Sequence, residues 1–271
     1  MANTNSTIKW IECPRDAMQG WKNFIPTQKK ITYLNALLKV GFDTLDFGSF
    51  VSPKAIPQMA DTGEVLKGLF LQSKTKLLAI VANFRGAQEA MTFDEISYLG
   101  FPFSISPTFQ LRNTNSTIEE SLKRVADIQN LCIKNQKKLV IYISMGFGNI
   151  YGDAYDETIA LHWVDKISAM GIKTISIADT VGVASPQLVN SILKAVIPAY
   201  PETEIGVHLH STAVSWKDKI DAALQTGCRR FDGGPTGSSF QSPAWASTLI
   251  GDSTLALKSD PAVCLIKDAP L

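Results

Sequence analysis

The sequence predicts an α/β fold, a TIM (β/α)8 barrel, and three observations support this fold class. Short β-rich segments alternate with helical patterns along most of the 271-residue chain. With 45% hydrophobic residues, this length allows one large core, and barrels often reach it as a single domain. Acidic and histidine residues follow the ends of several predicted strands. A doubly wound open sheet is the alternative architecture.

The first part of the chain supplies four predicted strands and one well-marked helix. We expect strands over 8–12, 44–47, 77–81 and 98–105. The helix begins at Pro26, where Ile31, Leu34 and Leu38 recur at helical spacing, and Gly41 ends it.

The second part continues the alternation of strands and helices. Ser116-Thr117-Ile118-Glu119 is a capping-box pattern, which predicts a long helix that reaches about Asn135. We expect strands over 138–144, 174–177, 204–208 and 229–232. Helices are expected near 156–170, 186–197 and 213–226. Strands that alternate with helices of this length are typical of a parallel sheet.

Composition excludes several classes of partner. The charges nearly cancel, with 26 Lys and Arg against 25 Asp and Glu, so neither a nucleic-acid nor a membrane partner is expected. The N-terminal residues lack the build of a signal peptide, and no apolar run could span a bilayer. We therefore expect a soluble, cytoplasmic protein. Four scattered cysteines without paired metal spacing are expected to be mostly buried thiols: Cys13, Cys132, Cys228 and Cys264.

The candidate chemistry starts from His208-Leu209-His210, which holds two of the three histidines. Alternate side chains of a strand share a face, so both imidazoles point the same way. Arg15-Asp16 follows another predicted strand and adds a carboxylate. Asp16, His208 and His210 form an oxygen and nitrogen ligand set that suits Mg²⁺, Mn²⁺ or Co²⁺ better than a structural zinc. Solvated histidines and a surface ion pair are the alternative.

The positions of the candidate residues favour the barrel over the open sheet. Five of them lie at or just after the carboxyl ends of predicted strands: Asp16, Asp46, Asp179, His208 and His210. A barrel gathers these ends at one mouth, where its active sites lie. In a flat sheet, the first and seventh strands would be too far apart to share a metal.

A metal at this mouth would chelate a substrate that carries a carbonyl and a hydroxyl group. Arg15 could stabilise the enolate oxygen that forms when a carbon–carbon bond next to a carbonyl breaks. Asp46 and Asp179 could orient a ligand, hold a water, move a proton or only cap a helix. Candidates for substrate binding are Gln19, Ser49, Lys54 and Asn83. Lys54 could contact an acidic cofactor.

These residues stand in motifs that resemble the 3-hydroxy-3-methylglutaryl-CoA lyase family, metal-dependent barrels with aldol and Claisen-type chemistry. The motifs are ECPRDAMQ at 12–19, SFVSPK at 49–54 with PQM at 57–59, DTVG at 179–182 and HLHST at 208–212. The SFVSPK run is rather specific to the lyase, whereas Arg-Asp and His-x-His are shared across the superfamily. The resemblance covers about residues 8–233.

The resemblance implies a TIM barrel that cleaves hydroxymethylglutaryl-CoA to acetyl-CoA and acetoacetate with Mg²⁺ or Mn²⁺. It implies that Arg15 stabilises the enolate of the acetyl-CoA product. Asp16, His208 and His210 would bind the cation, and His208 would also move protons. The expected partners are a small-molecule acyl-CoA substrate and a second copy of the chain in a homodimer.

The chain departs from this family at several positions. Asp179 matches a family acid, but Asp46 stands where the family usually has a glutamate, which is one methylene longer. The family's loop after the eighth strand carries a catalytic cysteine, and the corresponding residues 233–245 contain none. Ser242 falls near the cysteine position, and Asp252 falls near an asparagine ligand, which makes Asp252 a candidate fourth ligand. A serine hydroxyl is a far weaker acid than a thiol, so the proton step should slow severely.

The whole chain, 1–271, is predicted to be one barrel domain with an atypical end after the eighth strand. Prolines interrupt any helical pattern after Asp232, so residues 234–271 are predicted to be a divergent tail. A diverged paralogue or a shifted reading frame would explain this. Two other functions stay open: a related barrel aldolase or acyl-CoA condensing enzyme, and a catalytically impaired barrel that binds metal or acyl-CoA.

Overall fold

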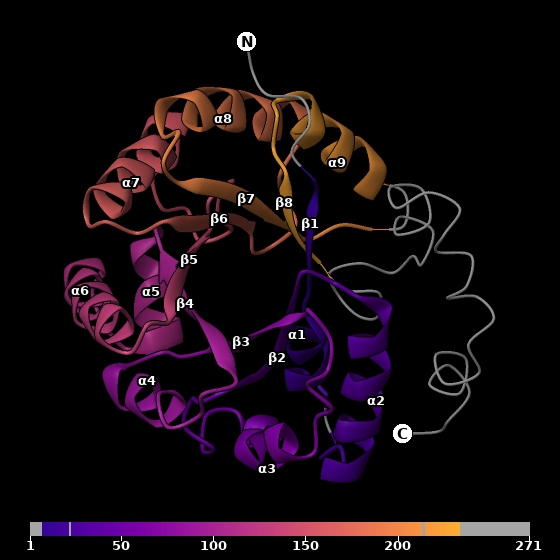
Figure 1. The fold of residues 1–271 in the computed structure, drawn as a ribbon. Coiled ribbons are helices and arrows are strands. Elements are labelled where there is room, and N and C mark those ends of the chain that lie inside the picture. The colour runs from indigo at the N-terminus through magenta and orange to yellow at the C-terminus, as the bar shows by residue number, and fades with distance from the viewer. Residues whose placement is uncertain (1–6, 22, 213–214, 234–271) are drawn as a thin grey trace.

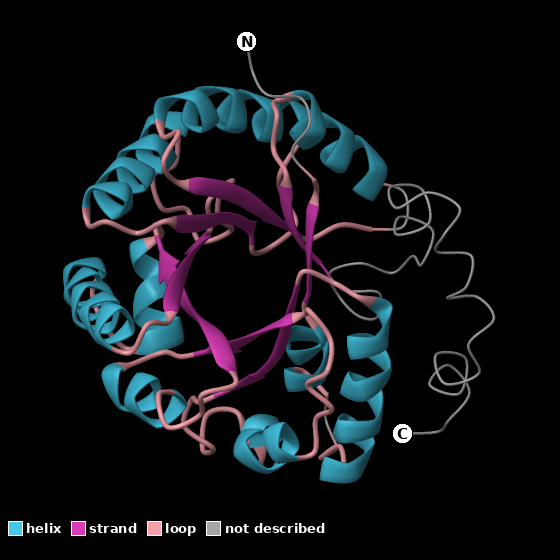
Figure 2. Ribbon diagram, in the orientation of Figure 1, coloured by secondary structure: helices cyan, strands magenta, loops and turns pink. Residues whose placement is uncertain are grey.

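The computed structural model describes residues 7–21, 23–212 and 215–233. Within these residues, strands β1 to β8 pair in chain order, and β8 pairs with β1 to close a parallel barrel (Figure 1). Helices surround the barrel on its outside (Figure 2). The predicted TIM barrel is therefore confirmed.

The bounds of the elements follow. The strands are β1 (Lys9–Glu12), β2 (Thr44–Ser49), β3 (Lys76–Ile80), β4 (Ile96–Ser104), β5 (Lys138–Ser144), β6 (Thr174–Asp179), β7 (Glu204–Leu209) and β8 (Arg230–Gly233). The helices are α1 (Pro14–Gln19), α2 (Thr27–Val40), the 3-10 helix η1 (Pro57–Met59), α3 (Thr62–Lys67), α4 (Phe84–Ala90), α5 (Pro107–Thr114), α6 (Ile118–Lys134), α7 (Glu157–Ala169), α8 (Pro186–Ala199) and α9 (Trp216–Gln225).

The predicted strands are all present, and their ends shift by one or two residues at most. The predicted capping box is displaced by one residue. The hydroxyl of Thr117 accepts from the Glu120 backbone N–H, and the Glu120 carboxylate accepts from the Thr117 N–H. Ser116 is not the cap because its hydroxyl contacts Gln110 and Thr114 instead. The short helices α1, α3, α4 and α5 were not predicted, since six to eight residues show little periodicity.

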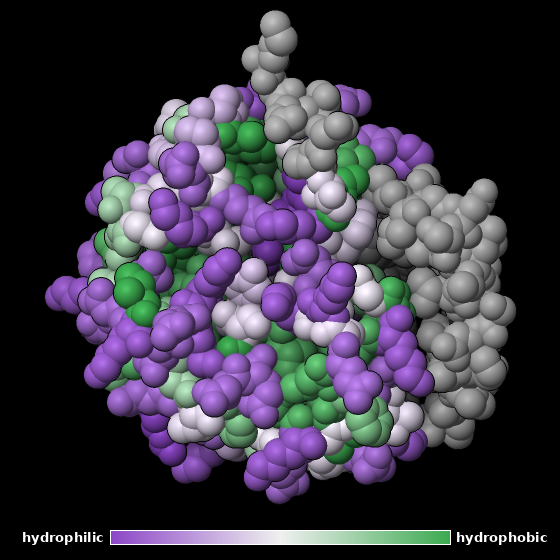
Figure 3. All heavy atoms as spheres, in the orientation of Figure 1, coloured by the Kyte–Doolittle hydropathy of each residue, from purple (hydrophilic) through white to green (hydrophobic). Residues whose placement is uncertain are grey.

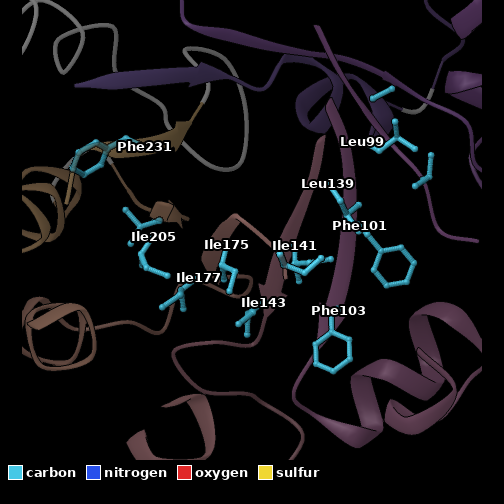
Figure 4. Close-up of a cluster of buried hydrophobic side chains, with 14 of the residues drawn as sticks. Leu99, Phe101, Phe103, Leu139, Ile141, Ile143, Ile175, Ile177, Ile205 and Phe231 are labelled. Atoms are coloured by element: carbon cyan, nitrogen blue, oxygen red, sulfur yellow. The ribbon is translucent and has the colours of Figure 1, made fainter. Parts of the chain in front are cut away.

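The outer face of the barrel carries the main hydrophobic core. Leu99, Phe101 and Phe103 of β4 alternate with inward residues and pack toward the helices, as do Ile175 and Ile177 of β6 (Figure 4). All five side chains are buried. Burial of such side chains stabilises the fold by roughly 1.5–3 kcal/mol each. This layer attaches the helices to the barrel.

The barrel interior holds a small apolar cluster and a group of buried charged side chains. Leu78, Ile80, Val140 and Tyr142 form the apolar cluster from β3 and β5. Arg230 of β8 is almost completely buried in the same interior.

The buried Arg230 is neutralised on both sides of its guanidinium. Its Nη2 lies 3.3 Å from Asp232 Oδ1, and its Nη1 lies 3.5 Å from Glu204 Oε2. Asp232 also accepts from the Ser176 hydroxyl and, at 3.3 Å, from the Tyr142 hydroxyl. Buried charge of this kind is tolerated because it is paired and hydrogen-bonded.

Hydrophilic side chains cover much of the face seen in Figure 3, with smaller hydrophobic areas between them. Among the described residues, no helix combines the length and apolar character needed to cross a membrane. The predicted divergent tail, 234–271, lies outside the described residues, and so do Ser242 and Asp252.

Gly206 on β7 leaves the space that the Arg230 side chain occupies. A Cβ atom at position 206 would lie 2.7–2.9 Å from three carbons of that side chain. We expect Gly206→Ala to lower the free energy of unfolding by about 1–3 kcal/mol, because a closely packed interior does not accept an added methyl group. Urea unfolding followed by circular dichroism measures this change.

The matched control for this prediction is Gly20→Ala, because a Cβ there meets no atom within 4 Å. Its unfolding midpoint should stay within experimental error of the parent or rise slightly. Equal stability of the two variants would contradict the packing explanation.

Candidate active site

The end of β1 leads into α1, which carries a cation and a carboxylate together. Pro14 suits the start of the helix because its φ is fixed and it needs no N–H partner. Arg15 and Gln19 are four positions apart and so share a helix face. Arg15 Nη1 donates to Gln19 Oε1 at 3.0 Å and to Asp16 Oδ1 at 2.9 Å.

The histidine pair lies at the end of β7. Alternation turns His208 into the barrel, because Val207 and Leu209 belong to the outer hydrophobic core. His210 follows the last residue of the strand. The two Nε2 atoms lie 3.2 Å apart, and Asp16 Oδ2 lies 3.8 Å from each of them. The three side chains that the sequence singled out therefore converge.

Burial and neighbouring charges give these side chains the protonation states that a cation requires. Burial lowers the pKa of His208, so its imidazole is neutral near pH 7. Burial also disfavours the charged form of Asp16. The Arg15 guanidinium, with a smaller contribution from the His210 side chain, outweighs that effect and holds the pKa of Asp16 well below its usual range. The result is an ionised carboxylate beside a neutral imidazole.

The donor set fits a divalent cation. One carboxylate oxygen and two imidazole nitrogens all lie within 4.8 Å of one another. The polar contacts of His208 run through Nε2, since its Nδ1 is buried without a hydrogen-bond partner among the described residues. Oxygen and imidazole ligands together suit Mg²⁺, Mn²⁺ and related ions.

The Arg15 guanidinium is the centre of a wider ionic cluster. Its Nη2 lies 2.6 Å and its Nε 3.0 Å from Asp46 Oδ2, so Asp46 holds the planar group from one side. Asp46 and Asp16 together keep the pKa of Arg15 raised in spite of its burial. The side chain is therefore a fixed cation beside the histidine pair.

Asp46 does not stand at a strand end as predicted, because β2 continues to Ser49. It is the third residue of the strand and is fully buried. The pairing of β2 with β3 shifts between Asp46 and Gly48, a β-bulge beside the site. Burial raises the pKa of Asp46 to about 6, and the Arg15 guanidinium opposes this effect.

A cavity of about 770 Å³ opens over the cluster. Arg15, Asp16, His208 and His210 line it. Two of the candidate substrate-binding residues, Gln19 and Asn83, also line it. Asn83 has a second role, because its side chain accepts from Gly86 N at 2.9 Å and caps α4.

Three sequence candidates are not among the described residues that line the cavity. Ser49 is buried and lines a separate small pocket, and its hydroxyl has no hydrogen-bond partner within the described part of the chain. Lys54 is exposed and is absent from the cavity lining. Along β6, Asp179 lies on the same outward face as Ile175 and Ile177. Its neighbours Ala178 and Thr180 therefore line the cavity instead. The period of two along a strand explains this correction.

The structure also brings residues to the cavity that the sequence analysis missed. They are Arg112 with Asn113 after β4, Arg124 on α6, and Tyr142 on β5. The signal for Arg112 was available, since it follows the fourth strand of a predicted barrel. No local pattern marks Tyr142, whose ring meets the His208 ring edge-on at 5.9 Å between centroids.

The fold and the ionic cluster at its mouth define a TIM-barrel enzyme. The family model described as HMGL-like matches residues 7–238. The chain belongs to this family, as its motifs predicted. It is accordingly a lyase of the hydroxymethylglutaryl-CoA lyase type.

Named relatives agree with this family. Mitochondrial hydroxymethylglutaryl-CoA lyase of Mus musculus is 32% identical over 240 residues, which are 88% of this chain and 73% of the relative. A solved HMG-CoA lyase from Bacillus subtilis has a TM-score of 0.80 at 30% identity, over 88% of this chain and 80% of that one. The Acinetobacter baumannii HMG-CoA lyase, solved with coenzyme A and 3-methylmalate, gives 0.80 at 29% identity, over 90% and 80%.

Glu12, at the end of β1, is a buried carboxyl group that the site does not use. It is 1% exposed, and neither oxygen has a hydrogen-bond partner among the described residues. Burial, with a smaller contribution from Asp46, raises the pKa of Glu12 well above its ordinary value. The folded protein therefore holds this proton at pH values where the unfolded chain, with a pKa near 4.3, has released it.

We expect the contribution of Glu12 to stability to be lost as the pH rises. Between the unfolded and folded pKa values the folded state binds more protons, so each pH unit lowers stability by up to about 1.4 kcal/mol. Glu12→Gln should remove this slope, so its stability relative to the parent should be greater at pH 8 than at pH 4. Denaturant unfolding at several pH values measures the difference.

The control for this pH series is Glu95→Gln, at an exposed position. Its stability difference from the parent should stay flat across the same pH range. A Glu12→Gln difference that is equally flat would contradict the raised pKa.

Proposed function

We propose that this chain cleaves 3-hydroxy-3-methylglutaryl-CoA to acetyl-CoA and acetoacetate, with Mg²⁺ or Mn²⁺ held by Asp16, His208 and His210. The observation that carries the proposal is the convergence of these three side chains with Arg15 on one cavity. A bound divalent cation would polarise the substrate oxygens and fix their orientation. The names of the relatives support the choice of substrate.

Arg15 has one donor left for the reacting substrate. Its contacts with Asp46, Asp16 and Gln19 use four of the five guanidinium N–H groups. Counted over the described residues, one N–H on Nη2 remains. We assign this N–H to the thioester oxygen, where negative charge develops as the enolate forms. Asp46 would act through Arg15 by holding the guanidinium in place.

The reaction moves two protons and breaks one bond. The substrate's 3-hydroxyl loses its proton, the bond between C2 and C3 breaks, and its electron pair becomes the acetyl-CoA enolate. A proton then adds to C2. We assign the hydroxyl proton to His208, whose neutral ring can accept it. Both proposed roles of His208 use Nε2, because Nδ1 is buried, so Asp16 and His210 would hold the cation while His208 carries the proton.

The wider cavity suits an acyl-CoA. Arg112 and Arg124 both line it, and cationic side chains are the ordinary partners of phosphate groups. The Arg112 guanidinium lies 5.1 Å from the centre of the Tyr151 ring, which positions it. We assign to these two arginines the contact with an acidic cofactor that the sequence suggested for Lys54. We assign Gln19 and Asn83 to polar groups of the acyl chain.

Residues 233–245 support a second candidate function. They lack the cysteine of the family's loop, so no thiol is available there to protonate C2. A barrel that binds metal and acyl-CoA without turnover would have this composition. Its test is ligand binding by calorimetry in the absence of product. A related aldolase would instead release product from 2-oxo acid substrates.

The metal site predicts a stabilisation that depends on Asp16. Saturating Mn²⁺, at about 100 times its dissociation constant, should stabilise the parent by about 2.7 kcal/mol. The expected rise in melting temperature is about 5–10 °C. Asp16→Ala should abolish the rise, because it removes the only carboxylate of the described cluster. Differential scanning fluorimetry measures both proteins.

The control is Asp94→Ala, at an exposed position. It should retain the full rise. A rise that survives in Asp16→Ala would place the cation elsewhere and overturn the ligand assignment.

The loop difference predicts a slow parent enzyme that a thiol restores. With Mg²⁺ and hydroxymethylglutaryl-CoA, we expect Ser242→Cys to release acetoacetate at least about 10-fold faster than the parent. General acid–base steps contribute roughly 10²–10⁴-fold to enzymatic rates. A thiol that restores only part of the proton step would therefore still exceed the increase of about 10-fold. A coupled acetoacetate assay measures the rates.

Ser239→Cys is the matched control in the same stretch and should leave the parent rate unchanged. No acetoacetate from the parent or from Ser242→Cys, together with tight acyl-CoA binding by both, would favour the binding barrel over the lyase.

A further inference from the structure

A lysine lies buried behind the histidine pair, on the side away from the cavity. Lys219 projects from α9, and its side chain is 4% exposed. Its ammonium nitrogen Nζ lies 2.7 Å from Asp179 Oδ2 and 2.9 Å from the backbone carbonyl oxygen of His210. The partner carboxylate of Asp179 is completely buried. A charge pair this deep is costly in free energy unless good geometry and further hydrogen bonds compensate for the lost hydration.

The contacts of this pair join three segments of the chain. Asp179 is the last residue of β6, and its second oxygen accepts from the Ala184 backbone N–H at 3.1 Å. Lys219 therefore ties α9 to the end of β6 and to the residue that follows β7. Both carboxylate oxygens of Asp179 are engaged by these contacts. Asp179 therefore holds Lys219 and the backbone of Ala184 in place, and its carboxylate is not directed at the cavity.

His210 is the ligand that needs such a support. His208 lies inside β7, where backbone pairing with β6 and β8 holds it. The pairing of β6 with β7 ends at Asp179 and Leu209, so His210 lies beyond the ladder. Its ring is nevertheless set 3.2 Å from His208 and 3.8 Å from Asp16. The described contact to its carbonyl oxygen comes from Lys219.

We infer that Lys219, anchored by Asp179, is a positioning residue that fixes the His210 backbone and so completes the cation site. The inference rests on the proposed function, because it assumes that His210 is a ligand. It gives Asp179 a role through Lys219, in place of the proton transfer that the sequence suggested. Groups that orient a metal ligand in this way affect metal affinity by about 10–100-fold when they are removed.

The test separates positioning from simple stability with two variants. Lys219→Met alone leaves the buried Asp179 carboxylate unpaired and destabilises the fold. The double variant combines Lys219→Met with Asp179→Asn, so no buried charge of this pair remains unpaired. The new side-chain amide oxygen at position 179 can still accept from the Ala184 N–H, but the donor to the His210 carbonyl is gone. Lys217→Met is the matched control, because Lys217 lies on the same helix and pairs with Asp221 on the surface.

Two quantities are measured on each protein: the melting temperature without metal, and the Mn²⁺ dissociation constant by isothermal titration calorimetry. The assay temperature is kept about 15 °C or more below the lowest melting temperature, so all proteins are folded. We expect the double variant to recover most of the stability lost in Lys219→Met. Its Mn²⁺ affinity should nevertheless be about 10–100-fold weaker than that of the parent. Lys217→Met should match the parent in both quantities.

The possible failures are distinguishable. Mn²⁺ affinity within about twofold of the parent in the folded double variant would overturn the positioning role and leave the cation site intact. A loss of affinity in Lys217→Met equal to that in the double variant would also overturn it. A parent chain that binds no Mn²⁺ would overturn the cation site itself, and the positioning role with it.

Discussion

Closure of the barrel between β1 and β8 is the constraint on which the site depends. The register aligns Ile11 of β1 with Asp232 of β8, and Asp232 in turn with His208 of β7. Asp16, one helical turn beyond the end of β1, is thereby brought to the level of the histidine pair. In the sequence, most of the described chain lies between Asp16 and the histidine pair. In an open sheet, β1 and β7 would not share a mouth, and Asp16 would not meet the histidine pair.

The charged groups around this mouth leave an excess of negative charge. Arg15 contacts two carboxylates, Asp16 and Asp46, and the buried His208 adds no charge because its pKa is lowered. With both acids ionised, the cluster has one more negative than positive charge. In a site of low dielectric such an excess is costly without a counter-ion and favours a divalent ion or a cationic ligand. The same arrangement leaves Arg15 rigid and directed at the cavity.

The alternation of side chains along the strands decides which candidate residues reach the cavity. His208 takes the inward phase of β7 and lines it, whereas Asp179 takes the outward phase of β6 and packs against Lys219. Asp46 is inside the barrel although it precedes the end of its strand, and a β-bulge follows it. Of the other residues that line the cavity, Arg112 could have been predicted because it follows β4, whereas no local pattern marks Tyr142.

The sequence by itself determined the order of the strands and of the longer helices, because hydrophobic periodicity and caps are local properties. It also placed Arg15, Asp16, His208 and His210 at strand ends, since charged and histidine residues at such positions are visible without a structure. It could not decide the phase of Asp179, the one-residue shift of the Thr117 cap, or the buried partner Lys219. Each of these depends on which groups meet once the chain is packed. Tertiary structure decided them, because only packing shows which polar groups leave water and must find partners.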